Sequence, residues 1–170
     1  MQQVLITAAH SDDETLGCGG TIAKHTAQGD DVSVIFMTNG VGSRTGHSGE
    51  CITDRTRATE KAMEILGVKM HRSFDFPDNA LDTVPLLDIT KAIEETCKEW
   101  GLPKILYTHC PHDLNIDHRM VYEATMTCFR PQPSNKNQPE QILTYEVLSS
   151  TGWRSSATPM PFLPNYFVDI

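Results

Sequence analysis

The chain has 170 residues, of which 39% are hydrophobic and 21% are charged, and this composition is typical of a single soluble globular domain. Its 22 acidic and 14 basic residues give a formal net charge of −8. This excess of acid disfavours nucleic-acid binding, because a polyanion would be repelled and would gain no counterion release from a basic patch. No apolar run approaches the roughly 20 residues that span a bilayer, and the N-terminus lacks a basic signal segment. We therefore expect residues 1–170 to form one cytoplasmic domain with no membrane span.

The sequence contains five cysteines, and no two of them form a C-x-x-C pair. An odd number of cysteines cannot be fully paired within one chain, so reduced thiols are expected. Because the close spacing of a thiolate zinc site is missing, most of the cysteines are predicted to be small buried hydrophobic residues.

Short apolar runs alternate with segments of helical periodicity along the chain. The expected strands cover residues 3–9, 31–37, 70–74, 104–107 and 141–147, and the expected helices cover residues 14–28, 54–66, 86–100 and 118–129. Gly29, Gly67 and Gly101 follow three of these helices and act as stop signals. A proline-rich linker is expected over 130–139, and the tail from 157 to 170 is expected to be irregular because it contains three prolines.

This alternation predicts an α/β fold, a Rossmann-like three-layer sandwich with a mostly parallel sheet. In such a sheet, ligands bind at the carboxyl ends of the strands where the strand order reverses, between the first and fourth strands. The loops after these two strands carry four of the seven histidines together with four aspartates: His10, Asp12, Asp13, His109, His112, Asp113, Asp117 and His118.

Histidine nitrogen and carboxylate oxygen on converging loops favour a divalent metal site, and three protein ligands would leave a position open for water. His10 and Asp13 are separated by two residues, so a loop that enters a helix can turn both side chains onto one ion. The third ligand is expected from His118, or less favourably from His112 or His109. Taken singly, each histidine is better explained as a solvent-facing or loop-capping ring, and Asp12 and Asp13 as helix N-caps; the convergence of the whole set favours the metal.

Two further aspartates have candidate roles around this metal. Asp12 is adjacent to a predicted ligand, where a carboxylate is placed to take a proton from water. Asp117 either fixes the tautomer of an imidazole or is a first-turn acid favoured by the helix dipole.

The segment that begins Ala9-His-Ser-Asp-Asp-Glu14 resembles the A-H-P-D-D-E signature of the PIG-L/LmbE family of zinc-dependent N-deacetylases. Members of this family remove acetyl groups from N-acetylglucosamine conjugates and related amino sugars. The resemblance covers nearly the whole chain, with further matches at 57–60, 66–67, 76–82, 115–118 and 145–165.

The resemblance implies that His10, Asp13 and His118 bind Zn²⁺, or another divalent metal such as Fe²⁺, and that Asp12 is the general base. It also implies a small-molecule amino-sugar conjugate as the partner, with the substrate-binding residues Arg57, Asp78, Asn79 and His112. A homo-oligomer is possible, because the apolar tail over 160–170 can pack on a neighbouring copy. Because members commonly continue beyond a segment like 167–170, this chain is expected to be a short or truncated member.

Two residues depart from the family pattern. Ser11 replaces the usual proline, which removes no ligand. Asn115 stands where many members carry a histidine. An amide can donate a hydrogen bond to an oxyanion but cannot titrate, so the acid role would fall to protonated Asp12 or to His112.

Two other readings of the site stay open. Two histidines and one carboxylate also form the facial triad of non-haem Fe(II) oxygenases. The altered motif positions are equally compatible with a non-catalytic sugar-binding relic of the family.

Two glycine-rich segments have predicted structural roles. Gly17, Gly19 and Gly20 miss the spacing of a phosphate loop and are expected to serve close helix packing. The loop 40–49, with Arg44 and His47, is expected to be either a lid that meets substrate or a plain flexible loop.

Overall fold

The fold is described from a computed structural model that covers residues 1–43, 49–131, 138–154 and 161–170. The strands are β1 (Gln3–Ala8), β2 (Asp31–Thr38), β3 (Met70–Phe76), β4 (Ile105–His109) and β5 (Gln141–Tyr145). The helices are α1 (Asp13–Ala27), α2 (Gly49–Leu66), α3 (Leu86–Trp100) and α4 (Ile116–Cys128), with two 3-10 turns, η1 (Leu81–Thr83) and η2 (Thr151–Trp153).

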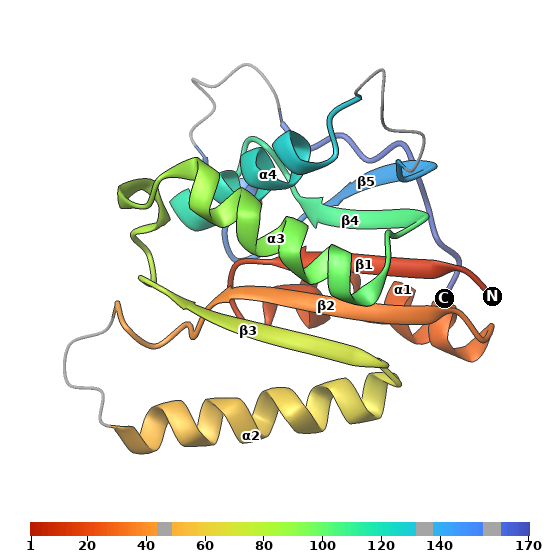
Figure 1. Cartoon of the computed structure of the whole chain (residues 1–170), viewed down its shortest axis with the longest axis horizontal. Helices are drawn as coiled ribbons and strands as arrows, with labels where there is room; N and C mark the ends of the chain where they lie inside the picture. Colours follow the sequence, from red (N-terminus) through yellow and green to blue (C-terminus); the bar gives the residue numbers. More distant parts are fainter. Residues whose placement is uncertain (44–48, 132–137, 155–160) are drawn as a thin grey trace.

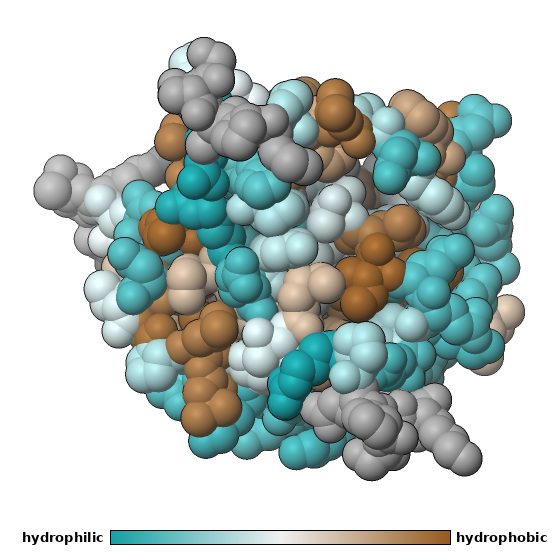
Figure 2. All heavy atoms as spheres, turned by 90° about the horizontal axis from the view of Figure 1, so that it is seen from above, coloured by the Kyte–Doolittle hydropathy of each residue, from teal (hydrophilic) through white to brown (hydrophobic). Residues whose placement is uncertain are grey.

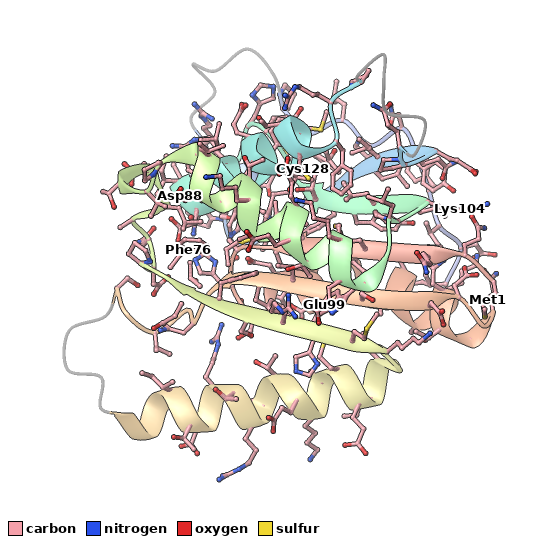
Figure 3. All side chains as sticks on the ribbon, viewed as in Figure 1. Met1, Phe76, Asp88, Glu99, Lys104 and Cys128 are labelled. Atoms are coloured by element: carbon pink, nitrogen blue, oxygen red, sulfur yellow. The ribbon has the colours of Figure 1, made fainter. Side chains whose placement is uncertain are left out.

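The five strands form one sheet in the order β3-β2-β1-β4-β5, and every pair of neighbours is parallel (Figure 1). In Figure 3, Met1 and Lys104, which precede β1 and β4, lie at one edge of the molecule, and Phe76 at the end of β3 lies at the opposite edge. The carboxyl ends of the strands therefore share one edge, as the predicted α/β fold requires.

Two hydrophobic clusters hold the helices against the sheet. Side chains of β1 alternate between them, because successive residues of a strand point to opposite faces. Val4 and Ile6 pack with residues of α1 and α2, including Ile22 and Met63. On the other face, Leu5 packs with residues of α3 and α4. The result is the three-layer sandwich expected from the sequence.

The observed element bounds differ from the predicted ones by a few residues. The largest difference is at α2, which begins at Gly49 instead of residue 54. Helix α4 begins two residues early, at Ile116, because the side-chain oxygen of Asn115 accepts the Asp117 backbone N–H and caps it. Arg44 and His47, named in the lid prediction, lie outside the described residues.

The strand order reverses between β1 and β4. The chain runs from β1 to β2 and β3 on one side, and then crosses to β4 and β5 on the other. Pairing of β1 with β2 continues to Ala8 and Phe36, whereas pairing of β1 with β4 ends at Ile6 and Tyr107. The last residues of β1 and β4 are therefore not paired with one another, and the loops that follow these two strands border a crevice.

The surface contains scattered hydrophobic residues. On the face seen in Figure 2, brown hydrophobic patches are separated by teal hydrophilic ones. Within the described ranges, no helix combines the length and apolar character needed to cross a bilayer. The four cysteines whose side chains are described are free thiols, and Cys18, Cys97 and Cys110 are buried, as predicted for this class of residue.

The predicted role of the α1 glycines in close packing is confirmed at two positions. A Cβ atom at Gly17 would overlap the ring of Tyr145, and one at Gly20 would overlap the side chain of Ile170. At Gly19 the nearest such atom, on Thr15, is 3.7 Å away. Gly17 thus lets α1 approach the end of β5.

We expect Gly17→Ala to lower the free energy of unfolding by about 1–3 kcal/mol, the usual cost of overpacking. Gly19→Ala is the matched control, because it has room and should stabilise the helix by up to about 1 kcal/mol. Urea denaturation of the two variants measures both values. Equal effects of the two substitutions would show that α1 does not need the close approach at Gly17.

Candidate metal centre

Three side chains that the sequence singled out as ligands converge at the crevice. The ligand atoms of His10, Asp13 and His118 all lie within 4.8 Å of one another. His10 Nδ1 is 3.2 Å from Asp13 Oδ2, and His118 Nε2 is 3.2 Å from Asp13 Oδ1. His10 follows β1, Asp13 begins α1, and His118 lies in the first turn of α4.

A tight turn after β1 brings His10 and Asp13 to the same side. The backbone N–H of Asp12 donates to the carbonyl oxygen of His10 at 3.0 Å. The backbone N–H of His10 in turn donates to Asp13 Oδ2 at 2.8 Å. The two residues between His10 and Asp13 therefore form a local loop, which is closed by the hydrogen bond from the His10 backbone N–H to the Asp13 carboxylate.

Outer carboxylates orient both imidazoles. His10 Nε2 donates to Asp117 Oδ2 at 3.1 Å and lies 3.2 Å from Asp78 Oδ1. His118 Nδ1 lies 3.2 Å from Asp113 Oδ2. A hydrogen bond at one ring nitrogen leaves the lone pair of the other for a metal. In the neutral rings, that lone pair is on His10 Nδ1 and His118 Nε2, the two atoms that face Asp13.

Asp117 lies beside His118 in the sequence but contacts His10 in the structure. Its Oδ2 accepts the backbone N–H of Asn79 at 2.6 Å, and its Oδ1 accepts that of Leu81 at 3.0 Å. Asn79 adopts a positive φ of 57°, a conformation that asparagine tolerates better than most residues. The loop after β3 therefore holds Asp117 against His10.

Asp113 was assigned no role from the sequence, although it lies in the same histidine-rich loop. It is fully buried and accepts hydrogen bonds from the Asn115 backbone N–H and from the hydroxyls of Ser150 and Thr151. Ser150 and Thr151 follow β5 at the far edge of the sheet, within the C-terminal stretch that resembles the family, but the sequence analysis assigned them no role. They anchor the carboxylate that orients His118.

The surrounding carboxylates favour positive charge at this site. Burial would lower the pKa of His10, but hydrogen bonds with Asp117 and Asp13 raise it to about 10. Burial opposes the charge of His118 in the same way, yet hydrogen bonds with Asp113 and Asp13 raise its pKa to about 9. Burial would raise the pKa of Asp13, but the hydrogen bonds from His10 and His118 and the charge of His118 hold this pKa well below its usual range. A divalent cation fits both this field and the three donor atoms.

A second group with suitable spacing consists of His10, Asp78 and Asp117. Both oxygens of Asp117 already accept backbone N–H groups, and Asp78 Oδ2 accepts the Ser43 N–H at 3.0 Å. This group is therefore better explained as the support that orients His10. Asp78, predicted to meet substrate, is largely engaged with the protein itself.

The two less favoured histidines, His109 and His112, are not part of the group with metal-ligand spacing among the described residues. The ring of His109 is fully buried, and its Nε2 accepts the backbone N–H of Ala9 at 2.9 Å, so that lone pair is occupied. His112 is partly buried and does not line the cavity at the site. From the β4 side, His118 is the candidate whose ring nitrogen groups with His10 and Asp13, with its Nε2 3.2 Å from Asp13 Oδ1.

Asp12 lies at the mouth of the cluster, with 49% of its side chain exposed. Its Oδ2 forms an ion pair with Arg55 Nη2 at 3.0 Å, and Arg55 Nε donates to Ser11 Oγ at 3.1 Å. Arg55 was not predicted as a site residue. Ser11, which stands in place of the family's proline, thus gives the arginine a second acceptor.

Arg57, predicted to meet substrate, lies away from the site. Its side chain is 75% exposed and pairs with Asp54 at 3.5 Å. Two residues along an α-helix turn a side chain by about 200°, so only one of Arg55 and Arg57 can face the crevice. Arg55, and not the predicted Arg57, is therefore the arginine that lies beside Asp12.

A cleft of about 330 Å³ opens over the cluster, and every residue that lines it is polar or glycine. Besides the three ligands, the lining includes Asp12, Arg55, Asp78, Asn79 and Asn115. The Asn115 oxygen is used as the helix cap, so its amide nitrogen is the group left to donate into the cleft.

Comparison with known proteins gives a consistent result. The PIG-L family model, described as GlcNAc-PI de-N-acetylase, matches residues 5–129. An Escherichia coli protein named uncharacterized deacetylase YaiS is 31% identical over 98% of this chain and 81% of its own length. Diacetylchitobiose deacetylase of Thermococcus kodakarensis is 37% identical over 100% of this chain, which spans 64% of that protein.

Solved structures share the fold. The conserved protein TT1542 of Thermus thermophilus superposes with a TM-score of 0.74 over 98% of this chain and 70% of its own, at 24% identity. Teicoplanin deacetylase Orf2, solved in a zinc-inhibited form, gives a TM-score of 0.73 over 94% of this chain and 73% of its own, at 18% identity. Because the family match includes all three converging ligands and most of the chain, this protein belongs to the PIG-L family of de-N-acetylases.

Proposed function

We propose that this protein is a zinc-dependent hydrolase that removes the acetyl group from an N-acetylated amino sugar and releases acetate and the free amine. The observation that carries the proposal is the convergence of His10, Asp13 and His118 beside the half-exposed carboxylate of Asp12. The deacetylase names of the relatives from Escherichia coli and Thermococcus kodakarensis support the same reaction.

His10, Asp13 and His118 would hold the metal. A zinc ion there supplies a Lewis acid that favours deprotonation of water and polarises the amide carbonyl. Fe²⁺ suits the same nitrogen and oxygen donors, and metal analysis after anaerobic purification distinguishes the two ions.

Asp12 is the residue placed to move the proton. Asp12 lies in the loop between His10 and Asp13, but its carboxylate has no contact with His10 or His118 among the described interactions. Arg55 holds it at the edge of the cleft. We assign it the role of general base toward the attacking water. Once protonated, Asp12 can return the proton to the leaving amine, because His112 does not line the cleft.

Asn115 is the candidate donor to the oxyanion. Its oxygen is fixed by the cap of α4, which orients the amide nitrogen as a hydrogen-bond donor. The amide cannot titrate, so it stabilises negative charge without exchanging protons. The entirely polar lining of the cleft suits sugar hydroxyls better than an apolar acyl chain.

The proposal predicts that the protein releases acetate from at least one N-acetylglucosamine conjugate, and that a chelator abolishes the release until Zn²⁺ is restored. The measurement is acetate release from a panel of nucleotide, lipid, thiol-precursor and oligosaccharide conjugates. Chelator-resistant release would contradict the metal requirement. Binding of a conjugate without release by the zinc-loaded protein would identify a sugar-binding protein instead.

Asp12→Asn should lower kcat by roughly 10²- to 10⁴-fold, the usual contribution of general acid–base catalysis, while one zinc ion per chain remains bound. Asp54→Asn removes a carboxylate from the exposed pair with Arg57 and is the matched control, with unchanged kcat. Zinc content is measured alongside the kinetics. Loss of zinc from Asp12→Asn would make Asp12 a ligand and refute its role as the base.

Arg55→Ala should lower kcat/KM by roughly tenfold to a hundredfold, because it removes charged hydrogen bonds to Asp12 and Ser11 at the mouth of the cleft. Arg57→Ala is the control from the same helix, and it should stay within about twofold of wild type because its exposed ion pair contributes little. The opposite ranking of the two variants would restore Arg57 as the substrate-side arginine.

A further inference from the structure

His109 is a histidine of the crevice that is neither one of the proposed ligands nor part of the cleft lining. It is the last residue of β4, and it is fully buried. Its ring stacks on that of His118, with centroids 4.0 Å apart and planes inclined by 16°. Its Nε2 accepts the Ala9 backbone N–H at 2.9 Å. These two contacts join the chain segment that carries His10 to the helix that carries His118.

The hydrogen bond from Ala9 defines the state of the His109 ring. An imidazole nitrogen that accepts a backbone N–H must be unprotonated, so the proton of the neutral ring is on Nδ1. Nδ1 is buried and has no hydrogen-bond partner among the described residues. The Nε2 atom also lies 3.5 Å from Asp13 Oδ2, so the His109 ring borders the same carboxylate as His10 and His118.

The Ala9 contact lies where the sheet lacks a ladder. Pairing between β1 and β4 ends at Ile6 and Tyr107. Ala9 lies three residues beyond that pair, and a buried N–H left without a partner there would be costly. The His109 ring supplies the missing acceptor from the opposite strand. It therefore sets the separation of the two strand ends at the point where the crevice opens.

The stack constrains a different degree of freedom. The hydrogen bonds of His118 to Asp113 and Asp13 lie along its two ring nitrogens and fix rotation within the ring plane. They leave the tilt about the line between those nitrogens less restricted. A second ring lying 4.0 Å from His118 and inclined to it by only 16° limits that tilt. The Tyr145 ring in turn packs against His109, with the two ring centroids 5.0 Å apart.

We propose that His109 is a positioning residue of the metal centre, which holds the ligands His10 and His118 in register through the Ala9 hydrogen bond and the ring stack. This inference rests on the proposed metal site and not on which substrate is hydrolysed. It predicts that His109 tunes the affinity and coordination geometry of the metal without contributing a ligand.

The test compares three substitutions at His109. His109→Ala removes both contacts and should weaken Zn²⁺ binding by roughly 10- to 100-fold, as for other residues that support metal ligands. His109→Gln can keep an acceptor for Ala9 but loses the stack. His109→Phe keeps the stack but loses the acceptor. The Kd for Zn²⁺ of each of these two variants should lie between that of the wild type and that of His109→Ala.

The Kd is measured by competition with a chromophoric chelator, and the visible spectrum of Co²⁺-substituted protein reports the ligand geometry. Met63→Ala is the control, because Met63 is a buried residue of α2 that packs in the other hydrophobic cluster. It should lower stability while leaving the Kd within about twofold and the Co²⁺ spectrum unchanged. A merely structural role of His109 would make His109→Ala behave like this control.

Unchanged Kd and Co²⁺ spectra in folded His109→Ala would overturn the inference. Complete loss of binding, as expected for His118→Ala, would overturn it in the other direction by making His109 a ligand. The outcome is independent of catalysis, because no substrate is present. If the wild-type protein releases no acetate but the His109 substitutions weaken Zn²⁺ binding as expected, the proposed function is refuted and the positioning role of His109 stands.

Discussion

The buried carboxylate of Asp13 is the group on which the site depends. Its two oxygens face His10 and His118, and a third contact reaches the backbone N–H of His10. A charge taken out of water is costly unless it is paired and hydrogen-bonded. Two strand-end loops, from β1 and from β4, must therefore come together to compensate one aspartate. Asp113 and Asp117 add further negative charge, so the assembled site favours a cation.

The topology of the sheet makes this convergence possible. Strands β1 and β4 are neighbours in space but lie about a hundred residues apart, at the point where the strand order reverses. The loops after β3 and β5 add the supports: the Asn79 and Leu81 amides for Asp117, and the Ser150 and Thr151 hydroxyls for Asp113. Four strand ends thus contribute to one centre, and the excess acidic charge of the chain is partly gathered there.

The sequence was sufficient to predict the three-layer α/β sandwich, because apolar strands and amphipathic helices alternate with clear stop signals. The candidate ligands His10, Asp13 and His118 could be predicted because they lie just beyond buried strands, in a fold whose ligand crevice has a known position. Other features depended on packing that periodicity does not report. The choice between Arg55 and Arg57 is a matter of rotation around α2. The pairing of Asp117 with His10 joins loops about a hundred residues apart, and the stack of His109 on His118 depends on how the β4–α4 loop folds back on itself.

The most direct test of the metal centre is anomalous diffraction at the zinc edge from crystals of the zinc-loaded protein. We expect one peak at about 2.0–2.2 Å from His10 Nδ1, an Asp13 carboxylate oxygen and His118 Nε2, the usual distances for nitrogen and oxygen ligands of zinc. A peak ligated by other residues, or no peak at the crevice in zinc-saturated crystals, would contradict the assignment.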